Sequence, residues 1–468
     1  LKALLPRYEG KVKCIYIDPP YNTGNEGWVY NDNVNDPRIK KWLGEVVGKE
    51  GEDLSRHDKW LCMMYPRLKL LHRLLAEEGV IFISIDDTEF SYLRLICDEI
   101  FKNFAEAIVW QKRTSPDARK KLSSGHEYVL IYTKNSDQSL GLKLLPLEGK
   151  DAEAYTNPDS DPRGPWISSP FTAPGYRPNQ MYPITTPAGK TMMPPKGRCW
   201  CNIEEVYQRL LSEGRMWFGA DGNGVPRRKT YLSEREGRGV WTWWTNSEVG
   251  YTQIATQELA AILGKAVFDY PKPIRLISRI IQMASSDGDI ILDSFAGSGT
   301  TAHAVLNMNK ADGGHRKFIL VEMMDYAESI TAERVKRVID GYGEGKNAVA
   351  GTGGDFTFYD LGHVLLLPNG NLNEDVGAEK IREYVYFMET KSSIEPDKTD
   401  EPYYMGVHLD SAYYFFYERD SLTTLSRDFL GSIKTKADRY TIYADQCTLS
   451  QAELERWHIT FKKIPRDI

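Results

Sequence analysis

The stretch KCIYIDPPYNTG, residues 13–24, places an acid, two prolines and an aromatic residue directly after a run of strand-forming residues. Such residues could activate an amino group on a nucleobase, which is a poor nucleophile because its lone pair is delocalised into the ring. Two hydrogen-bond acceptors aimed at its N–H bonds would draw the nitrogen toward tetrahedral geometry and free that lone pair. Asp18 could supply one acceptor and the carbonyl of Pro19 the other, held still by the rings of Pro19 and Pro20. Tyr21 could stack on the base, and the other interpretation of the stretch is an ordinary turn after a strand.

A second group of candidate residues surrounds the glycines of ILDSFAGSGTTAHAV, residues 291–305. Gly297 and Gly299 lie between an expected strand and an expected helix, where glycine lets the backbone approach a ligand and a helix N-terminus favours an anionic group. Glu322 ends the next expected strand and is placed to bind ribose hydroxyls. With Ala302 the pattern satisfies the dinucleotide fingerprint, so the loop alone fits both NAD and S-adenosylmethionine. The candidate cofactor-binding residues in this group are Asp293, Phe295, Gly297, Ser298, Gly299, Thr300 and Glu322.

The two groups together select the chemistry. A nicotinamide enzyme has no use for acceptors aimed at an amino group, so the stretch from Asp18 to Tyr21 favours the methyl donor S-adenosylmethionine over NAD. Cytosine C5 methylation would need a cysteine nucleophile, and no Pro-Cys dipeptide occurs in the chain. Three alternatives stay open: methylation of cytosine N4, which uses the same geometry, a catalytically silent DNA-recognition subunit, and an NAD oxidoreductase.

With these motifs in this order, the sequence resembles adenine-N6 DNA methyltransferases of the β order. In that order the catalytic motif precedes the recognition region and the cofactor motif comes last. The sequence is similar in particular to the modification (Mod) subunits of Type III restriction–modification systems. The resemblance covers roughly residues 1 to 362. It is carried by Asp18-Pro19-Pro20-Tyr21 with Asn22-Thr23-Gly24, by Lys272-Pro273 in FDYPKPIRLISRII, by Phe295-x-Gly297-x-Gly299 and by GGDFTFYDLG.

The resemblance implies an enzyme that transfers a methyl group from S-adenosylmethionine to N6 of an adenine flipped out of double-stranded DNA. It implies that the Asp18–Tyr21 motif is catalytic, and it adds Lys272 and Pro273 to the cofactor site. It also implies a homodimer and a helicase–nuclease restriction subunit as partner. The chain has no G-x-x-x-x-G-K-[ST] loop, so we do not expect it to hydrolyse ATP by that route. Because members of the family have a strand and an acidic motif just before the position of Leu1, we expect the native protein to extend upstream of that residue.

Basic clusters mark where DNA would be bound. Lysine and arginine supply phosphate contacts, and arginine also reads base edges, although a basic cluster can equally be a solvated face. The tryptophans of VWTWW, residues 240–244, belong to the same region and are more simply interpreted as a small aromatic core. Asp86 and Asp87 end another expected strand and either lie near the site or cap the next helix. The candidate DNA-binding residues are Lys112, Arg113, Lys120, Lys121, Arg227, Arg228 and Lys229.

Alternating strands and helices must position these motifs. Continuous apolar strands such as VIFISID are typical of a parallel sheet that is covered on both faces. The βαβα order predicts an α/β fold with a Rossmann-like S-adenosylmethionine-dependent methyltransferase sheet. Residues 21–55 are expected to be irregular. Strands are expected at 13–17, 80–86, 107–110, 289–293 and 317–322, and helices at 60–78, 88–101, 274–284, 300–309 and 326–339.

Shifts in composition divide the chain into modules. We expect the catalytic half of the methyltransferase domain at 1–112, an inserted target-recognition domain at 113–264 and the cofactor half at 265–345. A glycine-rich linker, 341–354, should precede a C-terminal α/β module at 355–468 that serves partner binding or dimerisation. In that module YVYFME and AYYFFYERD are expected to form strands.

Composition sets further limits on function. The 468 residues carry a net charge of −6, so binding to DNA requires a local basic surface. No apolar run approaches the length of a membrane span. Six cysteines in this length favour a reducing compartment, the cytoplasm. Cys199 and Cys201 are too few ligands for a zinc site, and methyl transfer of this kind needs no metal ion.

Overall fold

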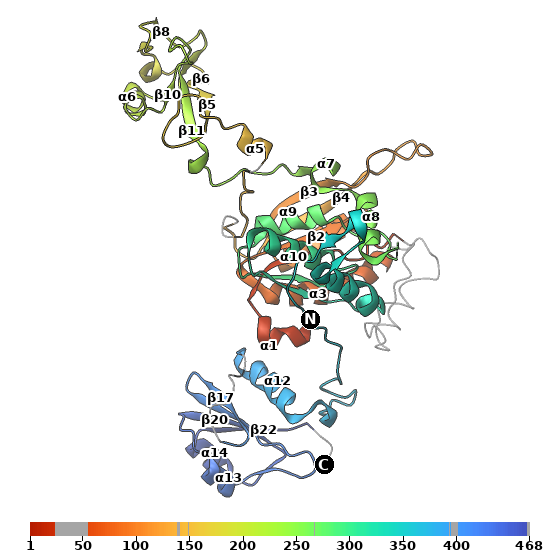
Figure 1. Cartoon of the computed structure of the whole chain (residues 1–468). Coiled ribbons are helices and arrows are strands. Elements are labelled where there is room, and N and C mark those ends of the chain that lie inside the picture. The colour runs from red at the N-terminus through yellow and green to blue at the C-terminus, as the bar shows by residue number, and fades with distance from the viewer. Residues whose placement is uncertain are drawn as a thin grey trace. The chain divides into compact units, whose positions relative to one another are not determined.

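The computed structural model describes residues 1–23, 55–137, 141–147, 149–265, 267–392, 394 and 401–465 (Figure 1). Most of the region expected to be irregular, 21–55, lies outside these described residues. The central feature is a seven-stranded sheet in the order β12-β3-β4-β2-β1-β13-β14. Its strands are β1 (Val12–Ile17), β2 (Leu75–Ile85), β3 (Asn103–Gln111), β4 (His126–Thr133), β12 (Trp243–Trp244), β13 (Ile290–Asp293) and β14 (Lys317–Leu320).

The parallel strands at the centre of the sheet gather the chemical motifs at one edge. β1 lies between β2 and β13 and runs parallel to both, and β13 runs parallel to β14. Ile15 pairs with Leu292 on one side and with Ile81 on the other. Because parallel neighbours end at the same edge, the residues after β1, β13 and β14 meet there.

Helices cover the sheet on both faces. Residues 80–85 of β2 are all buried, as expected for a strand with helices above and below it. Ile15 and Ile17 pack in one apolar core with Leu68 and Leu71, and α9 contacts both β1 and β2. The helices around the sheet are α1 (Leu5–Tyr8), α3 (Ser55–Leu74), α4 (Phe90–Ile100), α7 (Asn246–Val249), α8 (Thr252–Leu263), α9 (Ile274–Ala284), α10 (Thr300–Asp312) and α11 (Glu333–Asp340), with a wider π-helical turn at Ala327–Ala332 before α11.

An inserted compact unit comprises Leu142–Trp241. It contains a three-stranded antiparallel sheet in the order β10-β11-β5 and a separate apolar core that includes Phe171, Trp200 and Tyr207. Its elements are α5 (Lys150–Glu153), β5 (Trp166–Pro170), β6 (Thr172–Pro174), β7 (Ile184–Thr185), β8 (Thr191–Met192), β9 (Arg198–Trp200), α6 (Glu204–Ser212), β10 (Met216–Trp217) and β11 (Arg227–Tyr231).

The C-terminal module has a four-stranded sheet in the order β17-β18-β20-β22. β18, β20 and β22 are parallel and β17 is antiparallel, and Tyr414 and Ile442 lie in the core beneath them. The expected α/β class, with an inserted domain and a C-terminal α/β module, is confirmed. The elements of the module are α12 (Ala378–Thr390), β17 (Tyr404–His408), β18 (Ser411–Phe415), β19 (Thr424–Leu425), α13 (Arg427–Ser432), β20 (Arg439–Ala444), β21 (Gln446–Cys447), α14 (Gln451–Arg456) and β22 (Ile459–Lys463).

The inserted unit is shorter than the 113–264 expected from composition. β4 lies within that range but hydrogen-bonds between β2 and β3 of the large sheet. Trp243 and Trp244 form β12, which pairs with β3. The chain therefore forms four strands of the sheet, β1 to β4, before it enters the unit, and adds β12, β13 and β14 after leaving it.

Three local expectations differ from the structure. The helix expected at 60–78 ends at Leu74, because Leu75 already pairs with Val12. YVYFME, residues 384–389, lies in α12 and not in a strand, and buries Tyr386 and Phe387. The expected linker 341–354 contains the short hairpin β15 (Gly341–Tyr342) and β16 (Val349–Ala350), whose end bonds back to α11 through the amide of Thr352 and the carbonyl of Val338.

Within the described part of the chain, the helices are all too short or too polar to cross a membrane.

Candidate active site

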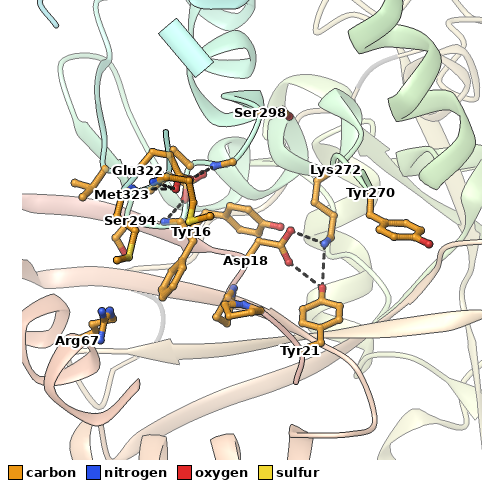
Figure 2. A pocket seen from close by; sticks show the side chains of 18 of the residues that line it. Tyr16, Asp18, Tyr21, Arg67, Tyr270, Lys272, Ser294, Ser298, Glu322 and Met323 are labelled. Carbon is orange, nitrogen blue, oxygen red and sulfur yellow. Dashed lines mark hydrogen bonds and ion pairs between the residues drawn. The ribbon is translucent and has the colours of Figure 1, made fainter. Parts of the chain in front are cut away.

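A cleft of about 2000 Å³ opens at the edge where β1, β13 and β14 end (Figure 2). It brings together the two groups of residues that the sequence analysis singled out, although they lie far apart in the chain. The predicted site residues that line it are Asp18, Pro19, Pro20, Tyr21, Lys112, Arg113, Lys120, Lys272, Asp293, Phe295, Gly297, Ser298, Thr300 and Glu322.

The Asp18–Tyr21 loop is held from two sides. The indole nitrogen of Trp60 on α3 donates a 2.7 Å hydrogen bond to the carbonyl of Pro20. The hydroxyl of Tyr21 lies 2.9 Å from Oδ1 of Asp18 and can donate to it. Burial of Tyr21 and the charge of Asp18 raise the pKa of this hydroxyl well above its usual value, so the hydroxyl keeps its proton and remains a donor.

The side chain of Lys272 reaches the Asp18–Tyr21 loop. Its ammonium donates to Oδ2 of Asp18 at 2.6 Å and to the hydroxyl of Tyr21 at 3.0 Å. Burial lowers the pKa of Lys272, but the charges of Asp18 and Glu127 outweigh that effect and the pKa is raised. Of the predicted cofactor residues, Lys272 thus contacts the carboxylate of Asp18, whereas the neighbouring Pro273 is buried at the start of α9.

Glu127 on β4 completes this network and was not predicted from the sequence. Its Oε1 accepts from Lys112 at 2.9 Å, and its Oε2 lies 3.1 Å from the hydroxyl of Tyr21 and 3.6 Å from the ammonium of Lys272. Burial raises the pKa of Glu127, but the charges of Lys272 and Lys112 hold the pKa below its usual value. Glu127 is therefore an ionised carboxylate inside the site.

The glycine loop has a conformation that only glycine adopts easily. Gly297 has a φ of 50° and Gly299, which begins α10, has a φ of 79°. A Cβ on Gly299 would lie 3.1 Å from the carbonyl oxygen of Thr331. The guanidinium of Arg334 donates to the hydroxyls of Ser298 and Thr300 from beneath the loop. The loop is therefore tightly supported on the side away from the cleft.

Glu322 follows β14 and fixes the backbone around the glycine loop. Its Oε2 accepts from the amide of Gly297 at 2.8 Å, and its Oε1 accepts from the amides of Met323 and Met324 at 2.9 and 3.0 Å. A carboxylate offers about four accepting sites, so about one remains for a ligand.

Asp293 ends β13 beneath the loop. Its carboxylate accepts from the hydroxyl of Thr301 at 2.5 Å and from the amide of Phe295 at 3.1 Å. Burial raises the pKa of Asp293 to about 7, although these two hydrogen bonds act in the opposite direction.

Replacing Asp293 with Asn should remove a pH dependence of stability. Between the ordinary carboxyl pKa near 4 and a value of about 7 in the fold, the folded chain holds a proton that the unfolded chain has released. Folding stability should therefore fall across this window by up to about 1.4 kcal/mol per pH unit because of Asp293 alone. Urea unfolding from pH 4 to 7 should show the free energy of wild type falling relative to Asp293→Asn. Parallel curves for the two proteins would contradict the assignment.

The remaining predicted DNA-binding residues lie in two places. Residues 112–125 form a hairpin between β3 and β4, closed by the amide of Lys112 and the carbonyl of Gly125. Arg113, Lys120 and Lys121 are exposed on it, whereas the side chain of Lys112 is turned to Glu127. The exposed part of this hairpin fits contact with a polyanion.

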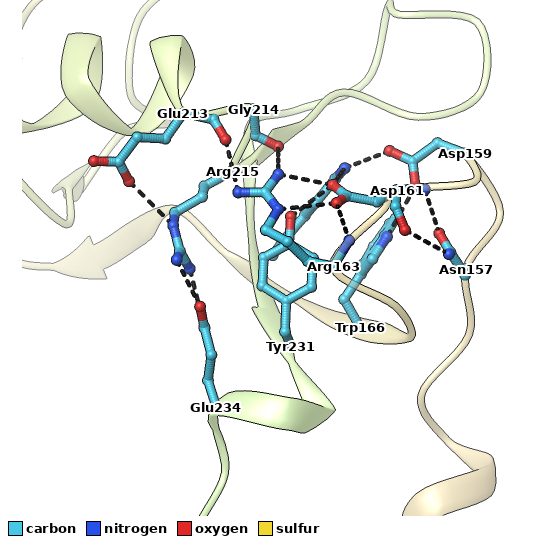
Figure 3. A network of polar contacts seen from close by, with 11 residues as sticks. Asn157, Asp159, Asp161, Arg163, Trp166, Glu213, Gly214, Arg215, Tyr231 and Glu234 are labelled. Atoms are coloured by element: carbon cyan, nitrogen blue, oxygen red, sulfur yellow. Dashed lines mark hydrogen bonds and ion pairs between the residues drawn. The ribbon is translucent and has the colours of Figure 1, made fainter.

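The second basic cluster, Arg227 to Lys229, lies on β11, where successive side chains point to opposite faces of the sheet. Lys229 is only 4% exposed, forms ion pairs with Asp159 and Asp161, and lies over the ring of Trp166. Figure 3 shows Asp159, Asp161 and Trp166 close together in this network. Arg227 donates to the hydroxyl and carbonyl of Ser168. Arg228 points to the opposite face and is exposed. Lys229 is thus committed to ion pairs inside the unit and could contact a phosphate only by breaking them.

Arg228 and Lys229 should therefore respond differently to substitution. Arg228→Ala should weaken DNA binding and reduce the log–log salt slope by about 0.9 for a lost phosphate contact, with an unchanged melting temperature. Lys229→Ala should destabilise the inserted unit by about 1–3 kcal/mol, since Asp159 loses its ion-pair partner, whereas Asp161 is still paired with Arg163. Filter binding across a salt series and thermal unfolding separate the two effects. A stable Lys229→Ala protein with a reduced salt slope would instead place Lys229 on the DNA.

Sequence reasoning missed Trp60 and Glu127. A signal existed for Glu127, because an acid within the apolar strand HEYVLIYT is seldom buried without a partner. Of the two aspartates after β2, Asp86 lines the cleft and accepts from the amide of Thr88, and Asp87 is exposed.

Known proteins that are similar to this chain are named as Mod subunits or methyltransferases. A family model described as DNA methylase matches residues 12–333 of the chain. The Mod subunit of the Type III restriction-modification enzyme StyLTI of Salmonella typhimurium is 37% identical over 343 residues, 68% of this chain and 50% of that protein. The EcoP15I Mod subunit of Escherichia coli is 32% identical over 69% of this chain and 56% of that protein. The Type II methyltransferase M.KpnI of Klebsiella pneumoniae is 34% identical over 66% of this chain and 74% of that protein. The chain therefore spans about half the length of the two Mod subunits it matches.

Proposed function

The chain belongs to the DNA methylase family, and from this premise we propose that it is a site-specific, S-adenosylmethionine-dependent DNA methyltransferase. The methyl group goes to N6 of an adenine flipped out of double-stranded DNA. Its Type III Mod relatives support a role as the modification subunit of a restriction–modification or phage-defence system. Both substrates are available in the cytoplasm, where we expect the protein to act.

The observation that carries this proposal is the meeting of two motifs in one cleft. The Asp18–Tyr21 loop follows β1, and the glycine loop follows β13, its direct parallel neighbour. A target base presented to Asp18 and a nucleoside cofactor held by the glycine loop would thus share one cavity. No rearrangement of the sheet is needed to bring the two together.

The residues of the glycine loop fit S-adenosylmethionine. Gly297 lines the cleft, where a Cβ would lie 3.1 Å from the ring of Phe268, and Glu322 retains about one accepting site for a ribose hydroxyl. The buried hydroxyl oxygen of Ser294 lines the cleft and has no hydrogen-bond partner among the described residues. The bound cofactor would supply an electrophilic methyl group.

The catalytic loop prepares the amino group. The carboxylate of Asp18 accepts one N–H of the adenine amino group, and we assign the second acceptor to the carbonyl of Pro19, since that of Pro20 is engaged by Trp60. The fixed ring of Tyr21 is available to stack on the extruded base, a contact worth about 1–3 kcal/mol. Flipping costs a few kcal/mol, which stacking and the two hydrogen bonds offset.

DNA is held by basic side chains outside the catalytic network. We assign phosphate contacts to Arg113, Lys120 and Lys121 on the hairpin and to Arg228 on the inserted unit, all of which are exposed. We also assign a phosphate contact to Arg227, although its guanidinium donates a hydrogen bond to the hydroxyl of Ser168. The inserted unit is the proposed target-recognition domain.

The partners follow from the family. We propose that the chain works with a helicase–nuclease restriction subunit and forms a homodimer, with the module 355–468 as the region for these contacts. Size-exclusion chromatography with light scattering, on the full chain and on a chain ending at residue 354, tests the assignment. A dimer of the full chain together with a monomer of the shortened chain supports the assignment. A shortened chain that is still a dimer contradicts it.

A product analysis tests the reaction. The protein is incubated with unmodified DNA and S-adenosylmethionine carrying a deuterated methyl group, and the hydrolysed nucleosides are analysed by mass spectrometry. Labelled N6-methyldeoxyadenosine is the expected product. Labelled N4-methyldeoxycytidine would correct the target base, and the absence of any labelled nucleoside would contradict the function.

A further inference from the structure

Glu127 is a buried carboxylate next to Asp18 that neither the catalytic loop nor the glycine loop requires. It comes from β4, an antiparallel strand that is not adjacent to β1 in the sheet. It nevertheless contacts the same groups as Asp18. The question is what a second ionised carboxylate does beside the one that accepts the amino group.

Two hydrogen-bond donors lie between the two carboxylates. The hydroxyl of Tyr21 has one proton and two acceptors, Oδ1 of Asp18 at 2.9 Å and Oε2 of Glu127 at 3.1 Å. The ammonium of Lys272 lies 2.6 Å from Oδ2 of Asp18 and 3.6 Å from Oε2 of Glu127. Both donors are therefore shared, with the shorter distance to Asp18 in each case.

The charges of this cluster balance. Asp18 and Glu127 are negative, and Lys112 and Lys272 are positive. Within the described part of the chain, two neutral rings also face Lys272, those of Tyr21 at 5.1 Å and Trp110 at 6.0 Å. Charges in a buried site interact strongly because water screens them little. Removal of Glu127 would leave Lys112 without its ion-pair partner, with Asp86, whose pKa is raised by burial, as a nearby acid, and would leave Lys272 paired with Asp18.

Without Glu127, the hydroxyl of Tyr21 and the ammonium of Lys272 would both bind Asp18 alone. Its oxygens would then be less able to accept an N–H bond from a base. We propose that Glu127 is a positioning residue for methyl transfer. It shares Tyr21 and Lys272 with Asp18, so that the Asp18 carboxylate remains available to the target amino group. This inference rests on the proposed function.

Single-turnover methylation with saturating DNA and cofactor tests the inference. Glu127→Gln should lower the rate by about 100-fold, as expected when a catalytic group is misplaced by about 1 Å, and should change cofactor affinity by less than about 3-fold. Adding Lys112→Met restores the balance of charge and should recover about 10-fold of that loss. Glu106→Gln, an exposed glutamate on the neighbouring strand β3, is the control and should match wild type.

The pH profile separates positioning from a structural role. In wild type Lys272 stays charged through the assay range, since its pKa is raised. Glu127→Gln removes one of the charges that raise this pKa, so burial should bring the titration of Lys272 into the alkaline range. Loss of the ammonium frees Asp18, and the variant should become faster with rising pH where wild type is flat. A merely unstable variant would become faster neither with rising pH nor on adding Lys112→Met.

A direct titration of Lys272 itself makes the test independent of the reaction. With lysine labelled at the ε-carbon, the NMR signal of Lys272 is identified by its loss in Lys272→Met and is then titrated. A lower pKa of Lys272 in Glu127→Gln supports charge sharing even if no DNA is methylated, in which case only the proposed function fails. An unshifted titration, or a wild-type rate in Glu127→Gln, overturns the inference. If Glu127→Gln does not fold, the double variant with Lys112→Met replaces it: its rate should remain about 10-fold below wild type, and a wild-type rate overturns the inference.

Discussion

Asp18→Asn should reduce the single-turnover rate of methyl transfer by at least about 10³-fold, the scale of losing a preorganised electrostatic contact. The amide cannot present two acceptor oxygens, and its NH₂ group would face the ammonium of Lys272, which lies 2.6 Å from Oδ2 in the wild type. The target amino group would then lose the acceptor that draws it toward tetrahedral geometry. Affinity for DNA should stay within about 3-fold, because phosphate contacts and not Asp18 supply it.

The exposed neighbour Asp87 provides a matched control. Asp87→Asn makes the same chemical change at the end of the adjacent strand β2, on a side chain that does not line the cleft. It should methylate at the wild-type rate. Rapid-quench assays with tritiated cofactor measure both variants. A rate for Asp18→Asn within about 10-fold of wild type would assign the chemistry to another residue.

Glu322→Ala should weaken binding of S-adenosylmethionine by about 100-fold, the equivalent of about 2.7 kcal/mol. The change removes the proposed ribose acceptor and also releases the amides of Gly297, Met323 and Met324, which the carboxylate now fixes. A hydrogen bond to a charged carboxylate such as Glu322 contributes about 1.5–3 kcal/mol. Because Glu322→Ala removes several such bonds, the 100-fold loss of affinity is a lower bound. Isothermal titration calorimetry measures the affinity.

The rate at saturating cofactor distinguishes binding from chemistry. Glu322→Ala should approach the wild-type rate once the site is filled, since Glu322 has no contact with Asp18 or Tyr21 among the hydrogen bonds of the cleft. Glu328→Ala, an exposed glutamate on the following helical turn, should bind cofactor normally. An unchanged affinity in Glu322→Ala would mean that the ribose acceptor lies elsewhere.

The elements around the site could be predicted where apolar pattern and local signals agree. The strand before Asp18 ends where prolines prevent its continuation, and α9 follows Pro273 with its apolar residues at helical spacing. Where the structure differs from the sequence prediction, contacts between residues far apart in the chain determine the local structure. Residues 76–78 favour helix locally, yet they lie in β2 because Leu75 and Val80, which flank them, pair with Val12 and Cys14 of β1. The aromatic run in α12 favours strand, but the helix buries Tyr386 in the C-terminal core and Phe387 in the core of the large sheet.

The candidate site was predictable only as far as its motifs extend. Asp18 and the glycine loop are contiguous signals, and parallel neighbours bring them together. The bond between Lys272 and Asp18 joins residues 254 positions apart, and Glu127 reaches them only because β4 inserts between β2 and β3. Lys229 was misleading for the same reason, since its acidic partners lie 68 and 70 residues away. Pairing over such distances leaves no trace in local composition.

The pairing of β1 with β13 has a consequence for how the protein is made. A ribosome releases β1 early, but the strand that covers its second edge follows roughly 270 residues later, on the order of 15–50 s at ordinary translation rates. During that interval a strand that is apolar except for Lys13 has one unpaired edge, the kind of surface that recruits other chains. The nascent chain should therefore lack the complete cleft and expose this edge until β13 has been synthesised, and slow translation of the inserted unit would lengthen that interval.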